Sequence, residues 1–600
     1  MLFIFLKRRK TGVFSMSFDY KKVLHVLDMV LPWVVFPCAS FYLMETFHHN
    51  PFQNMNEYVQ TLNIIVFMAI ALLLWMVTGS RKWAFRVESA IALIIGLADY
   101  YVIEFRGVPI VPWDVYAVKT AAGVSADYSY ALEPAAVWSV LAFVALIALE
   151  SVGKDYRIDR RYWAIRFAGG LCAVLVLFGE YQLLKSPQFI SQMRIYDKLF
   201  TPYAMIKRDG IALAFMLELQ YMEVEKPHHY NQARVAEAYE ALPEDAGEER
   251  KPNVIVVMNE AFSDLAVLGD FKTNEDYMPV MHGLQKGAEN TVTGTMNVSI
   301  MGGNTANTEF EFLTGSTMAF LPDGCVPYQQ YINAPVNSMA SYLKEMGYKT
   351  IAMHPYNATG WERNIAYPFM GFDAFYSLKN FSNVTKVREY VDDDSCVDRI
   401  IKEFEASEEP CFIFNVTMQN HSPYTAEYEN FTPDITVEGS DSFQLSTYLS
   451  LVKLSDASLG RLLEYFSQVD EDTVVVFFGD HQPTDSVVRD IWKLNGVDPD
   501  NLTEEQACLR YQVPFVVWAN YDIEEQTDVM TSANFLGAQV FDWCRIPNSG
   551  YQNYLLKLNE EFSAITGRTV MYKNGKFVEF KEVEDELLEY NMLQYYRIFG

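Results

Sequence analysis

The chain has 600 residues, of which 50% are hydrophobic, and a formal net charge of -29. Residues 1–220 hold 21 basic and 17 acidic side chains, whereas residues 221–600 hold 26 basic and 59 acidic ones. A C-terminal part this acidic argues against nucleic-acid binding, because phosphate backbones bind basic surfaces.

Five apolar stretches occupy the first third of the chain. They cover residues 24–46, 62–79, 88–105, 132–151 and 166–184. Each is close to the roughly 20 residues that a helix needs to cross a bilayer core. The sequence therefore predicts a five-helix transmembrane domain over residues 1–185.

Basic residues accumulate in the segments that would lie on one side of this domain. These residues are Lys7, Arg8, Arg9, Lys10, Lys21, Lys22, Arg81, Lys82, Arg86, Lys154, Arg157, Arg160, Arg161 and Arg166. The segments after the first and third stretches hold only Arg106 and Lys119. Because cytoplasmic loops collect Lys and Arg, we expect a multi-pass protein of the cell membrane with its N-terminus inside and its C-terminal domain outside. A cleavable signal peptide is the weaker alternative, since four further apolar stretches follow the first one.

Residues 186–252 connect the membrane domain to the rest of the chain. Within them, residues 199–223 alternate apolar groups with charged ones, which is typical of a helix lying on the membrane surface. Residues 227–252 are richer in charge and are expected to form a helix followed by a linker.

Residues 253–600 are expected to form one extracytoplasmic α/β domain. Short apolar runs alternate with helical patterns over 335–346, 392–405 and 443–467, which indicates a mainly parallel sheet covered by helices. The runs are 254–258, 350–353, 411–417, 474–478 and 513–518. Seven cysteines, none in a C-x-x-C pair, argue against a disulfide framework and a thiolate metal site.

Four of these runs end in acids, amides or imidazoles. They lead into Asn259-Glu260, His354, Gln419-Asn420-His421 and Gly479-Asp480-His481. Ligands of open α/β sheets bind beyond the carboxyl ends of parallel strands, so these side chains are expected to share one site. A single such residue would more often be structural, and the repetition at one edge favours a functional site.

Thr305 is the candidate nucleophile. It follows Gly302, Gly303 and Asn304 and precedes a helical pattern. A helix N-terminus favours anions, so the Thr305 hydroxyl would face a phosphate held there. The competing interpretation is an ordinary N-cap, a position that Thr fills well.

Glu260, Asp480, His481 and the Thr305 oxygen would form an oxygen-rich ligand set with one imidazole. Such a set suits Mn²⁺ or Mg²⁺, and Zn²⁺ is also compatible. A cation there would activate the Thr hydroxyl, which is otherwise a weak nucleophile.

The C-terminal part resembles the sulfatase/alkaline-phosphatase superfamily, and specifically the lipoteichoic acid synthase family. The segments that carry the resemblance are N-V-I-V-V-M-N-E-A-F-S at 253–263, G-G-N-T-A-N-T-E-F at 302–310, H-P-Y-N-A-T-G-W-E-R at 354–363, Q-N-H-S-P-Y at 419–424 and F-G-D-H-Q-P at 478–483. Five membrane spans before the catalytic domain also agree with this family.

The resemblance implies a role for individual residues. Glu260, Thr305, Asp480 and His481 correspond to metal ligands, and Thr305 also to the nucleophile. His354, Trp361, Arg363 and His421 correspond to residues of a glycerol-phosphate pocket. Arg can hold phosphate oxygens and His can exchange a proton with an alcohol near neutral pH, so these roles are chemically sensible. Trp361 could instead be packing, and Arg363 could pair with an acid such as Glu362 or Asp373.

Two positions depart from the family pattern. Gly360 stands before Trp361 where a bulkier residue is common, and Asp485 stands where a small hydroxyl residue is expected. A carboxylate at 485 could repel phosphate, bind a second cation or point away from the site.

The resemblance thus implies a metal-dependent phosphoglycerol transferase of lipoteichoic acid biosynthesis. Its donor would be phosphatidylglycerol, and its acceptor a glycolipid-anchored polyglycerolphosphate or another glycan, through a covalent threonine intermediate. His421 would activate the acceptor hydroxyl. The alternatives are a phosphodiesterase, a phosphoethanolamine transferase or a sulfatase-like hydrolase on another cell-envelope substrate, and a catalytically inactive wall-binding protein. A sulfatase of the usual type is disfavoured, because the sequence has no C-x-P-x-R or S-x-P-x-R motif.

Overall fold

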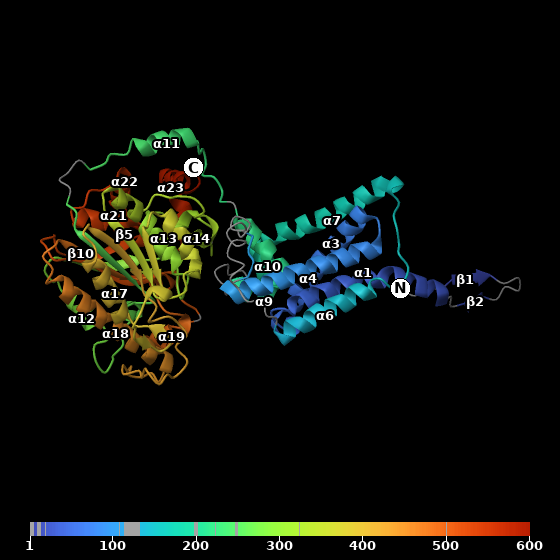
Figure 1. Cartoon of the computed structure of the whole chain (residues 1–600), viewed down its shortest axis with the longest axis horizontal. Helices are drawn as coiled ribbons and strands as arrows, with labels where there is room; N and C mark the ends of the chain where they lie inside the picture. Colours follow the sequence, from blue (N-terminus) through green and yellow to red (C-terminus); the bar gives the residue numbers. More distant parts are fainter. Residues whose placement is uncertain are drawn as a thin grey trace. The chain divides into compact units, whose positions relative to one another are not determined.

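The computed structural model describes residues 5–8, 14–17, 20–106, 109–112, 133–196, 202–222, 224–245, 250–322, 324–499 and 501–600. The chain divides into two compact units, Met1–Glu223 and Val224–Gly600 (Figure 1). The domain boundaries expected at residues 185 and 252 stay predictions.

All five apolar stretches of the first unit are helical. The helices are α1 (Tyr20–Glu45), α3 (Glu57–Thr78), α4 (Arg81–Arg106), α6 (Pro134–Leu149) and α7 (Trp163–Leu184). Among the described residues, two helices, Glu57–Thr78 and Arg160–Leu184, are long and apolar enough to cross a membrane. The five-span count is not confirmed, because α4 carries charged residues along its length and α6 has only 16 residues.

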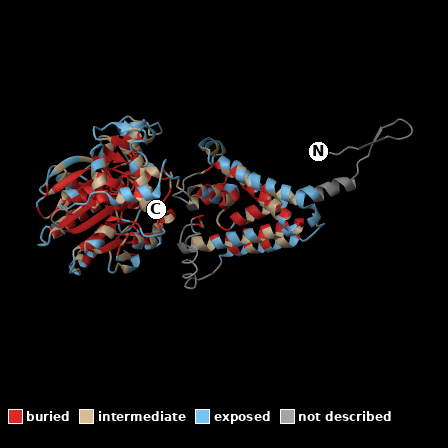
Figure 2. Cartoon of the chain, turned by 90° about the horizontal axis from the view of Figure 1, so that it is seen from above, coloured by how far each residue is buried: buried red, intermediate tan, exposed pale blue. Residues whose placement is uncertain are grey.

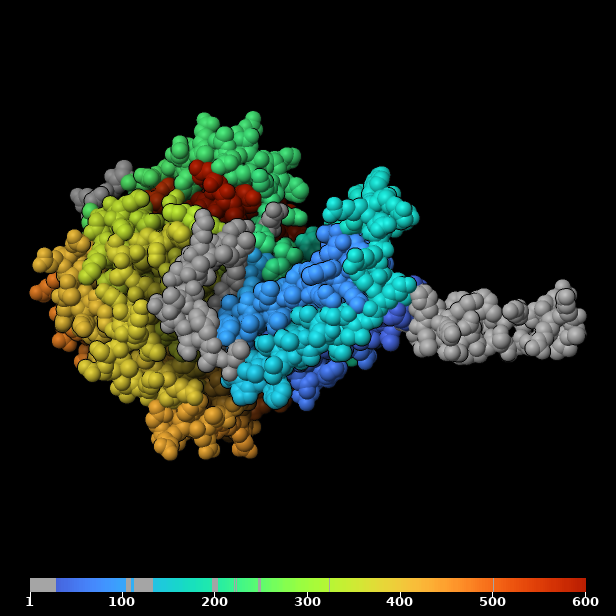
Figure 3. Space-filling model, turned by 45° about the vertical axis from the view of Figure 1, so that its right-hand side comes forward, coloured from blue at the N-terminus to red at the C-terminus, as the bar shows by residue number. Residues whose placement is uncertain are grey.

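Exposed apolar side chains are concentrated in this first unit. Trp138 of α6 is 71% exposed, and Trp163 and Phe167 of α7 are 71% and 66% exposed. Figure 2 shows pale blue, exposed positions along these helices, and Figure 3 shows α6 and α7 in cyan at the surface. Soluble monomers rarely expose such extended apolar surfaces, and lipid-facing helices do.

Contacts bring together the first half of α1 and two segments predicted to face the cytoplasm. Arg81, at the start of α4, donates to the backbone oxygen of Asp28 in α1 (2.7 Å) and to that of Lys154 (3.1 Å). Ser80 forms a β-bridge with Arg157. These segments therefore lie at the same end of the helical unit, as an alternating topology requires.

Two short helices replace the single surface helix expected over residues 199–223. They are α9 (Pro202–Asp209) and α10 (Ile211–Glu218), and residues 199–201 and 223 lie outside the described residues. Gly210 separates them with a φ of 79°, a conformation that glycine adopts without strain. Leu213 and Leu217 of α10 are buried in the core of the first unit, so α10 packs inside it.

An eight-stranded sheet forms the centre of the second unit, in the order β12-β4-β11-β10-β3-β9-β5-β6. Its strands are β3 (Asn253–Asn259), β4 (Thr291–Asn297), β5 (Lys349–His354), β6 (Ala374–Ser377), β9 (Cys411–Val416), β10 (Thr473–Gly479), β11 (Gln512–Ala519) and β12 (Gln526–Ser532). The strands from β10 to β6 are parallel, whereas β11 is antiparallel to both neighbours. The sheet is therefore mixed, and the expectation of an α/β domain is confirmed.

Helices cover both faces of this sheet (Figure 1). On one face, Ile255 and Val257 of β3 belong to a buried core that also includes residues of α12, α17, α18 and α19. On the other face, Phe312 of α13 lies 4.8 Å from Phe478 of β10 and 6.0 Å from Phe414 of β9, between ring centres. The main covering helices are α12 (Pro279–Leu284), α13 (Ala306–Thr314), α15 (Met339–Glu345), α17 (Asp393–Glu405), α18 (Phe443–Phe466), α19 (Asp485–Leu494), α21 (Ala533–Trp543) and α22 (Gly550–Asn559).

Smaller elements complete the described chain. The remaining helices include α2 (Pro51–Asn54), α8 (Pro187–Met193), α11 (Gln232–Glu240), α14 (Pro327–Gln330), α16 (Arg363–Phe369), α20 (Glu504–Leu509) and α23 (Leu588–Phe599). The remaining strands are β1 (Phe5–Arg8), β2 (Phe14–Ser17), β7 (Lys386–Val387), β8 (Tyr390–Val391), β13 (Phe562–Ile565), β14 (Val570–Tyr572) and β15 (Phe577–Val578). None of the seven cysteines, all of which lie in the described ranges, forms a disulfide bond.

Candidate active site

The strand ends singled out by the sequence meet at one edge of the sheet. Strands β10, β3, β9 and β5 are consecutive neighbours, and Gly479 pairs with Asn259 in register. The next residues, Asp480 and Glu260, therefore emerge side by side. One ligand atom from each of Glu260, Asp480 and His481 lies within 4.8 Å of the others, and all three residues are buried.

Backbone hydrogen bonds fix the Asp480 carboxylate. Its Oδ1 accepts from the backbone N–H of Ala261 (2.7 Å) and of His481 (2.8 Å). Its Oδ2 is buried and has no hydrogen-bond partner among the described residues. One oxygen thus holds the side chain in place, and the other remains available to a cation.

His481 presents its Nε2 to the same point. Its Nδ1 lies 2.9 Å from the backbone oxygen of Gln482, so this bond assigns the proton to Nδ1 and leaves the lone pair on Nε2. Nε2 lies 3.3 Å from Asp480 Oδ2 and 3.8 Å from Glu260 Oε1. This is the tautomer that a metal-binding histidine requires.

Glu260 is buried beside Asp480. Burial, reinforced by the Asp480 carboxylate, raises the pKa of Glu260 above its ordinary value. Two buried carboxylates this close repel one another, and a bound cation would offset that repulsion. Together with the unpartnered Asp480 Oδ2 and His481 Nε2, the set fits a divalent cation that prefers oxygen ligands.

Thr305 lies at this cluster and directs its hydroxyl into it. It stands at the N-terminus of α13, yet among the described residues its side chain caps no backbone N–H. Its Oγ1 instead donates to Glu260 Oε2 at 3.3 Å. Thr305 thus occupies the N-cap position of α13 without a side-chain capping bond, and its role as the nucleophile stays a prediction.

The position of Thr305 is set by the turn before α13 and by a hydrogen bond from the first turn of α13. Gly302, Gly303 and Asn304 have φ values of 68°, 150° and 73°, which glycine adopts freely and Asn tolerates. Thr308 Oγ1 donates to the backbone oxygen of Asp480 at 2.8 Å, which ties the first turn of α13 to the end of β10.

His354 and His421 are oriented in the same way as His481. His354 Nδ1 lies 3.0 Å from the Val416 oxygen, and His421 Nδ1 lies 2.7 Å from the Ser422 oxygen. Each Nε2 is therefore left as the acceptor. Burial lowers the pKa of both histidines, so they are neutral near pH 7. The Asp480 carboxylate raises the pKa of His421 and the Arg363 guanidinium lowers it, both less strongly than burial does.

Arg363 is buried, and its partner is Glu309, a residue that the sequence analysis missed. Glu309 Oε1 accepts from Arg363 Nε (3.0 Å) and Nη2 (2.5 Å), and its Oε2 accepts from the Tyr367 hydroxyl (2.6 Å). Burial alone would lower the pKa of Arg363, but the Glu309 and Tyr367 neighbours raise it above its usual value. Arg363 thus pairs with an acid, as the alternative interpretation suggested, but this acid is Glu309 rather than Glu362 or Asp373. The position of Glu309, four residues after Thr305, could have indicated it.

Trp361 lies in the turn that leads into Arg363. It is half-buried, and both Trp361 and Glu362 have positive φ, at 55° and 58°. Such residues cost about 1–3 kcal/mol each and are frequent at functional sites. A Cβ added at Gly360 would meet only Arg363 Nη1 at 3.7 Å, so a bulkier residue would fit there. The pocket role of Trp361 stays a prediction.

Arg510 and Tyr390 contact residues near the ligand cluster. The Asp485 carboxylate is 3.1 Å from Arg510 Nη2, which also donates to the backbone oxygen of Pro483 (2.7 Å). The charge of Asp485, the residue that departs from the family pattern, is thus balanced by Arg510. The Tyr390 hydroxyl lies 3.2 Å from His421 Nδ1 and from the Ser422 oxygen. Neither Arg510 nor Tyr390 carried a motif signal.

Comparison with known proteins agrees with this geometry. The family model described as Sulfatase matches residues 252–546. A Rhizobium meliloti protein, whose name assigns it to cyclic beta-1,2-glucan modification, is 32% identical over 74% of this chain and 70% of its own length. Lipoteichoic acid synthase 1 of Bacillus subtilis is 20% identical over 73% of this chain and 68% of its own. The solved Streptococcus pyogenes phosphoglycerol transferase GacH, in complex with sn-glycerol-1-phosphate, shares the fold with a TM-score of 0.50 and 23% identity, over 62% of this chain and 94% of its own. The chain therefore belongs to the sulfatase family and is a homologue of the lipoteichoic acid synthases.

Proposed function

We propose that the chain is a membrane-anchored phosphoglycerol transferase with its catalytic domain outside the cell. It would move glycerophosphate from phosphatidylglycerol to a glycerol or sugar hydroxyl. The observation that carries this proposal is the Thr305 hydroxyl, which donates to Glu260 inside the buried cluster of Glu260, Asp480 and His481. A threonine placed against metal-type ligands suits transfer through a covalent intermediate better than direct hydrolysis.

The residues that would hold the cation are Glu260, Asp480, His481 and the Thr305 oxygen. Their hard oxygen atoms favour Mn²⁺ or Mg²⁺, and the imidazole keeps Zn²⁺ compatible. When bound, the cation supplies Lewis-acid polarisation of the hydroxyl and offsets phosphoryl charge.

The reaction would then proceed by two successive displacements at phosphorus, in which Thr305 and His421 act. In the first, Thr305 Oγ1 forms a bond to phosphorus, and diacylglycerol leaves with the proton that Thr305 loses. In the second, His421 Nε2 accepts the proton of the acceptor hydroxyl as that oxygen attacks phosphorus. The Thr305 oxygen then leaves and regains a proton. Neutral His421 is the form that this step needs.

Arg363 would hold the phosphate group of the donor, with Trp361 beside it, and His354 Nε2 would accept a hydrogen bond from a hydroxyl of the glycerol head group. Glu309 occupies the Nε and Nη2 donors of Arg363, whereas Nη1 has only a long contact to the Gly360 oxygen (3.5 Å) among the described residues. Glu309 takes only one of the two Nη2 hydrogens, so Arg363 would offer Nη1 and the second N–H of Nη2 as a two-point fork to phosphate oxygens.

The acceptor is a glycan or a glycerophosphate chain, since the relatives' names point to one or the other. The test is to incubate the purified full-length chain and Mn²⁺ with head-group-labelled phosphatidylglycerol or phosphatidylethanolamine. We expect diacylglycerol from phosphatidylglycerol, with the label transferred to a saccharide or glycerol acceptor. Label released to water would indicate a phosphodiesterase, and preference for phosphatidylethanolamine would indicate a phosphoethanolamine transferase. Either result would overturn the proposal.

A further inference from the structure

An open groove in the first unit lies between the segment that joins α1 to α3 and the chain that follows α7. Its volume is about 750 Å³, which is within the range of ligand pockets. One wall comes from α2 and the residues after it, and the other from the end of α8 and from α9. Asn56 Nδ2 donates to the backbone oxygen of Arg194 at 3.0 Å, which joins the two walls.

The lining of this groove is basic. It carries three cationic side chains, Arg194, Lys207 and Arg208, and no acidic one. Lys207 Nζ lies 4.1 Å from the ring centre of Tyr203, and the Arg208 guanidinium lies 4.4 Å from that of Tyr196. Among the described residues, none of the three cations has a carboxylate partner or a hydrogen-bond acceptor for its side chain. Because a ring contact leaves the N–H donors of a cation free, the groove presents positive charge with donors available.

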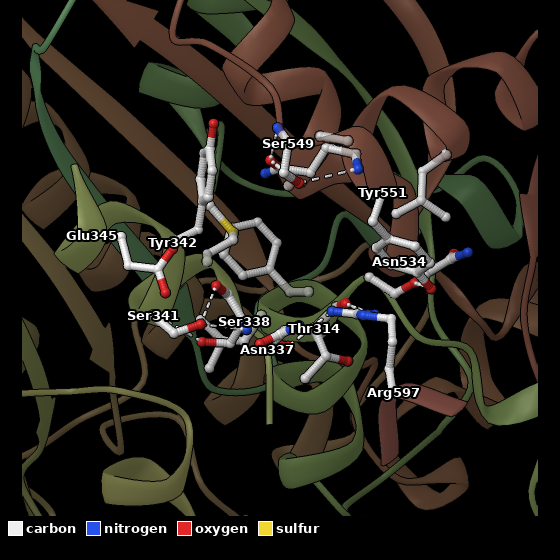
Figure 4. A pocket seen from close by; sticks show the side chains of 18 of the residues that line it. Thr314, Asn337, Ser338, Ser341, Tyr342, Glu345, Asn534, Ser549, Tyr551 and Arg597 are labelled. Atoms are coloured by element: carbon white, nitrogen blue, oxygen red, sulfur yellow. Dashed lines mark hydrogen bonds between the residues drawn. The ribbon is translucent and has the colours of Figure 1, made fainter. Parts of the chain in front are cut away.

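Neutral polar side chains of the groove are available as well. The amides of Gln53 and Asn54 and the hydroxyl of Ser191 make no hydrogen bond to any residue that the structure describes. The cavity between α13, α15, α21 and α22 differs in this respect, because Ser338 caps α15 there and Arg597 donates to two backbone oxygens (Figure 4). Uncommitted donors thus distinguish the groove of the first unit from that cavity.

The groove lies on the side of the membrane that is predicted to be outside. Its two walls follow the first and the fifth apolar stretches, which both end outside when the N-terminus is inside. Basic residues are otherwise scarce on that side, since the segments after the first and third stretches hold only Arg106 and Lys119. Tyrosines such as Tyr196 and Tyr203 are frequent at the membrane–water interface, and the nearby Phe52 is 70% exposed. Cations, tyrosines and an exposed apolar ring together suit the head-group level of a bilayer.

We propose that this groove binds the phosphate of an anionic phospholipid in the outer leaflet. Arg and Lys hold phosphate oxygens, and basic side chains near a membrane surface attract anionic lipids. Residues 221–600 carry 59 acidic and 26 basic side chains, so their overall charge repels such a lipid and a separate cationic site is needed to hold it. The proposal deepens the proposed function, on whose outward orientation it rests, by naming where the class of lipid that serves as donor is held on the membrane unit.

The test maps the labelling of the full-length chain in detergent by a photoactivatable phosphatidylglycerol. Phosphatidylcholine with the same photoactivatable chain is the comparison lipid, because it carries the phosphate without a net charge. We expect phosphatidylglycerol to label the segments around Asn54 and Arg194 at least fivefold more strongly than phosphatidylcholine does.

Two triple variants then test the cations. Arg194→Gln/Lys207→Gln/Arg208→Gln should reduce labelling of the segment around Asn54 at least tenfold, because the groove loses its positive charge. The matched control is Arg157→Gln/Arg160→Gln/Arg161→Gln, which removes the same charge from exposed residues between α6 and α7. The control should label like the parent.

Four results would overturn the proposal. Equal labelling by the two lipids, or equal labelling of the two triple variants, would show that the groove does not select an anionic lipid. Labelling confined to peptides that contain Glu260 or Thr305 would place the lipid at the catalytic centre. Displacement by millimolar inorganic phosphate at constant ionic strength would show that the groove takes a soluble anion. The mapping on the parent holds even if a variant fails to fold, and labelling requires no transfer step, so failure here leaves the proposed function testable on its own.

Discussion

Replacing Glu309 with glutamine leaves the buried Arg363 guanidinium without its counter-charge. The Glu309 carboxylate accepts three hydrogen bonds from Arg363 and one from Tyr367, and the side chains of Arg363 and Glu309 are 2% and 0% exposed. Removing one partner of a buried ion pair typically costs about 3–5 kcal/mol, because the other charge stays desolvated. The amide of Glu309→Gln would keep one acceptor oxygen, so we expect a loss at the lower end of this range, about 3 kcal/mol in the free energy of unfolding.

Glu311 provides a matched control on the same helix. It is buried, it accepts from Ser299 and from the Met318 N–H, and burial raises its pKa to about 7. Because its neutral form is already accessible at neutral pH, Glu311→Gln should cost less than about 1 kcal/mol. Urea unfolding of the full-length protein, followed by circular dichroism, compares the two variants.

Activity gives a second readout of the same change. Freed from Glu309, Arg363 would no longer be held beside the phosphate, so Glu309→Gln should also raise KM for phosphatidylglycerol at least tenfold, relative to Glu311→Gln. The reasoning is refuted if Glu309→Gln is no less stable than Glu311→Gln and has the same KM.

Three other predictions concern pH, the acceptor base and the cation. Burial raises the pKa of Asp393 to about 6, so between about pH 4 and pH 6 its carboxyl ionises in the unfolded chain and stays protonated in the folded one. The free energy of unfolding of the parent should therefore fall by about 3 kcal/mol relative to Asp393→Asn as the pH rises over this range. Unfolding measured at both pH values checks this, and a constant difference between the two proteins would contradict it. His421→Gln should lower kcat roughly 10²- to 10⁴-fold. In the parent, the activity loss on acidification should be centred below pH 6.5, because burial lowers the pKa of His421; an activity loss centred at or above pH 6.5 would exclude this role. Exhaustive chelation should abolish transfer and added Mn²⁺ should restore it, whereas Asp480→Asn should bind Mn²⁺ at least tenfold more weakly by calorimetry. Activity that survives chelation would show that transfer does not require a cation.

The core of the sheet was predictable because its strands are apolar on both faces. The runs at 254–258, 411–417 and 474–478 are buried throughout β3, β9 and β10. By contrast, β4 and β12 contain Thr, Gln and Asp and have no continuous apolar run. The antiparallel direction of β11 was also missed, since an apolar run does not reveal strand direction.

The catalytic cluster was predictable for a related reason. Parallel strands bring their carboxyl ends to one edge, so Glu260, Asp480 and His481 could be grouped before any distance was known. Pairs of side chains could not be predicted in this way. Glu309 and Arg363 are 54 positions apart, and their contact leaves no periodic pattern in the sequence. The sequence also could not show where the Thr305 hydroxyl points, since a cap and a nucleophile require the same residue type; the structure directs it to Glu260.

The central claim is that Thr305 forms a covalent bond to phosphorus. It is tested most directly by mass spectrometry of peptides from His421→Gln after brief incubation with phosphatidylglycerol and Mn²⁺, because loss of the acceptor base should let the intermediate accumulate. We predict a glycerophosphoryl group on the peptide that contains Thr305, and none on the same peptide from the double variant with Thr305→Ala. Modification at another residue, or diacylglycerol release by Thr305→Ala at the parent rate, would contradict the account.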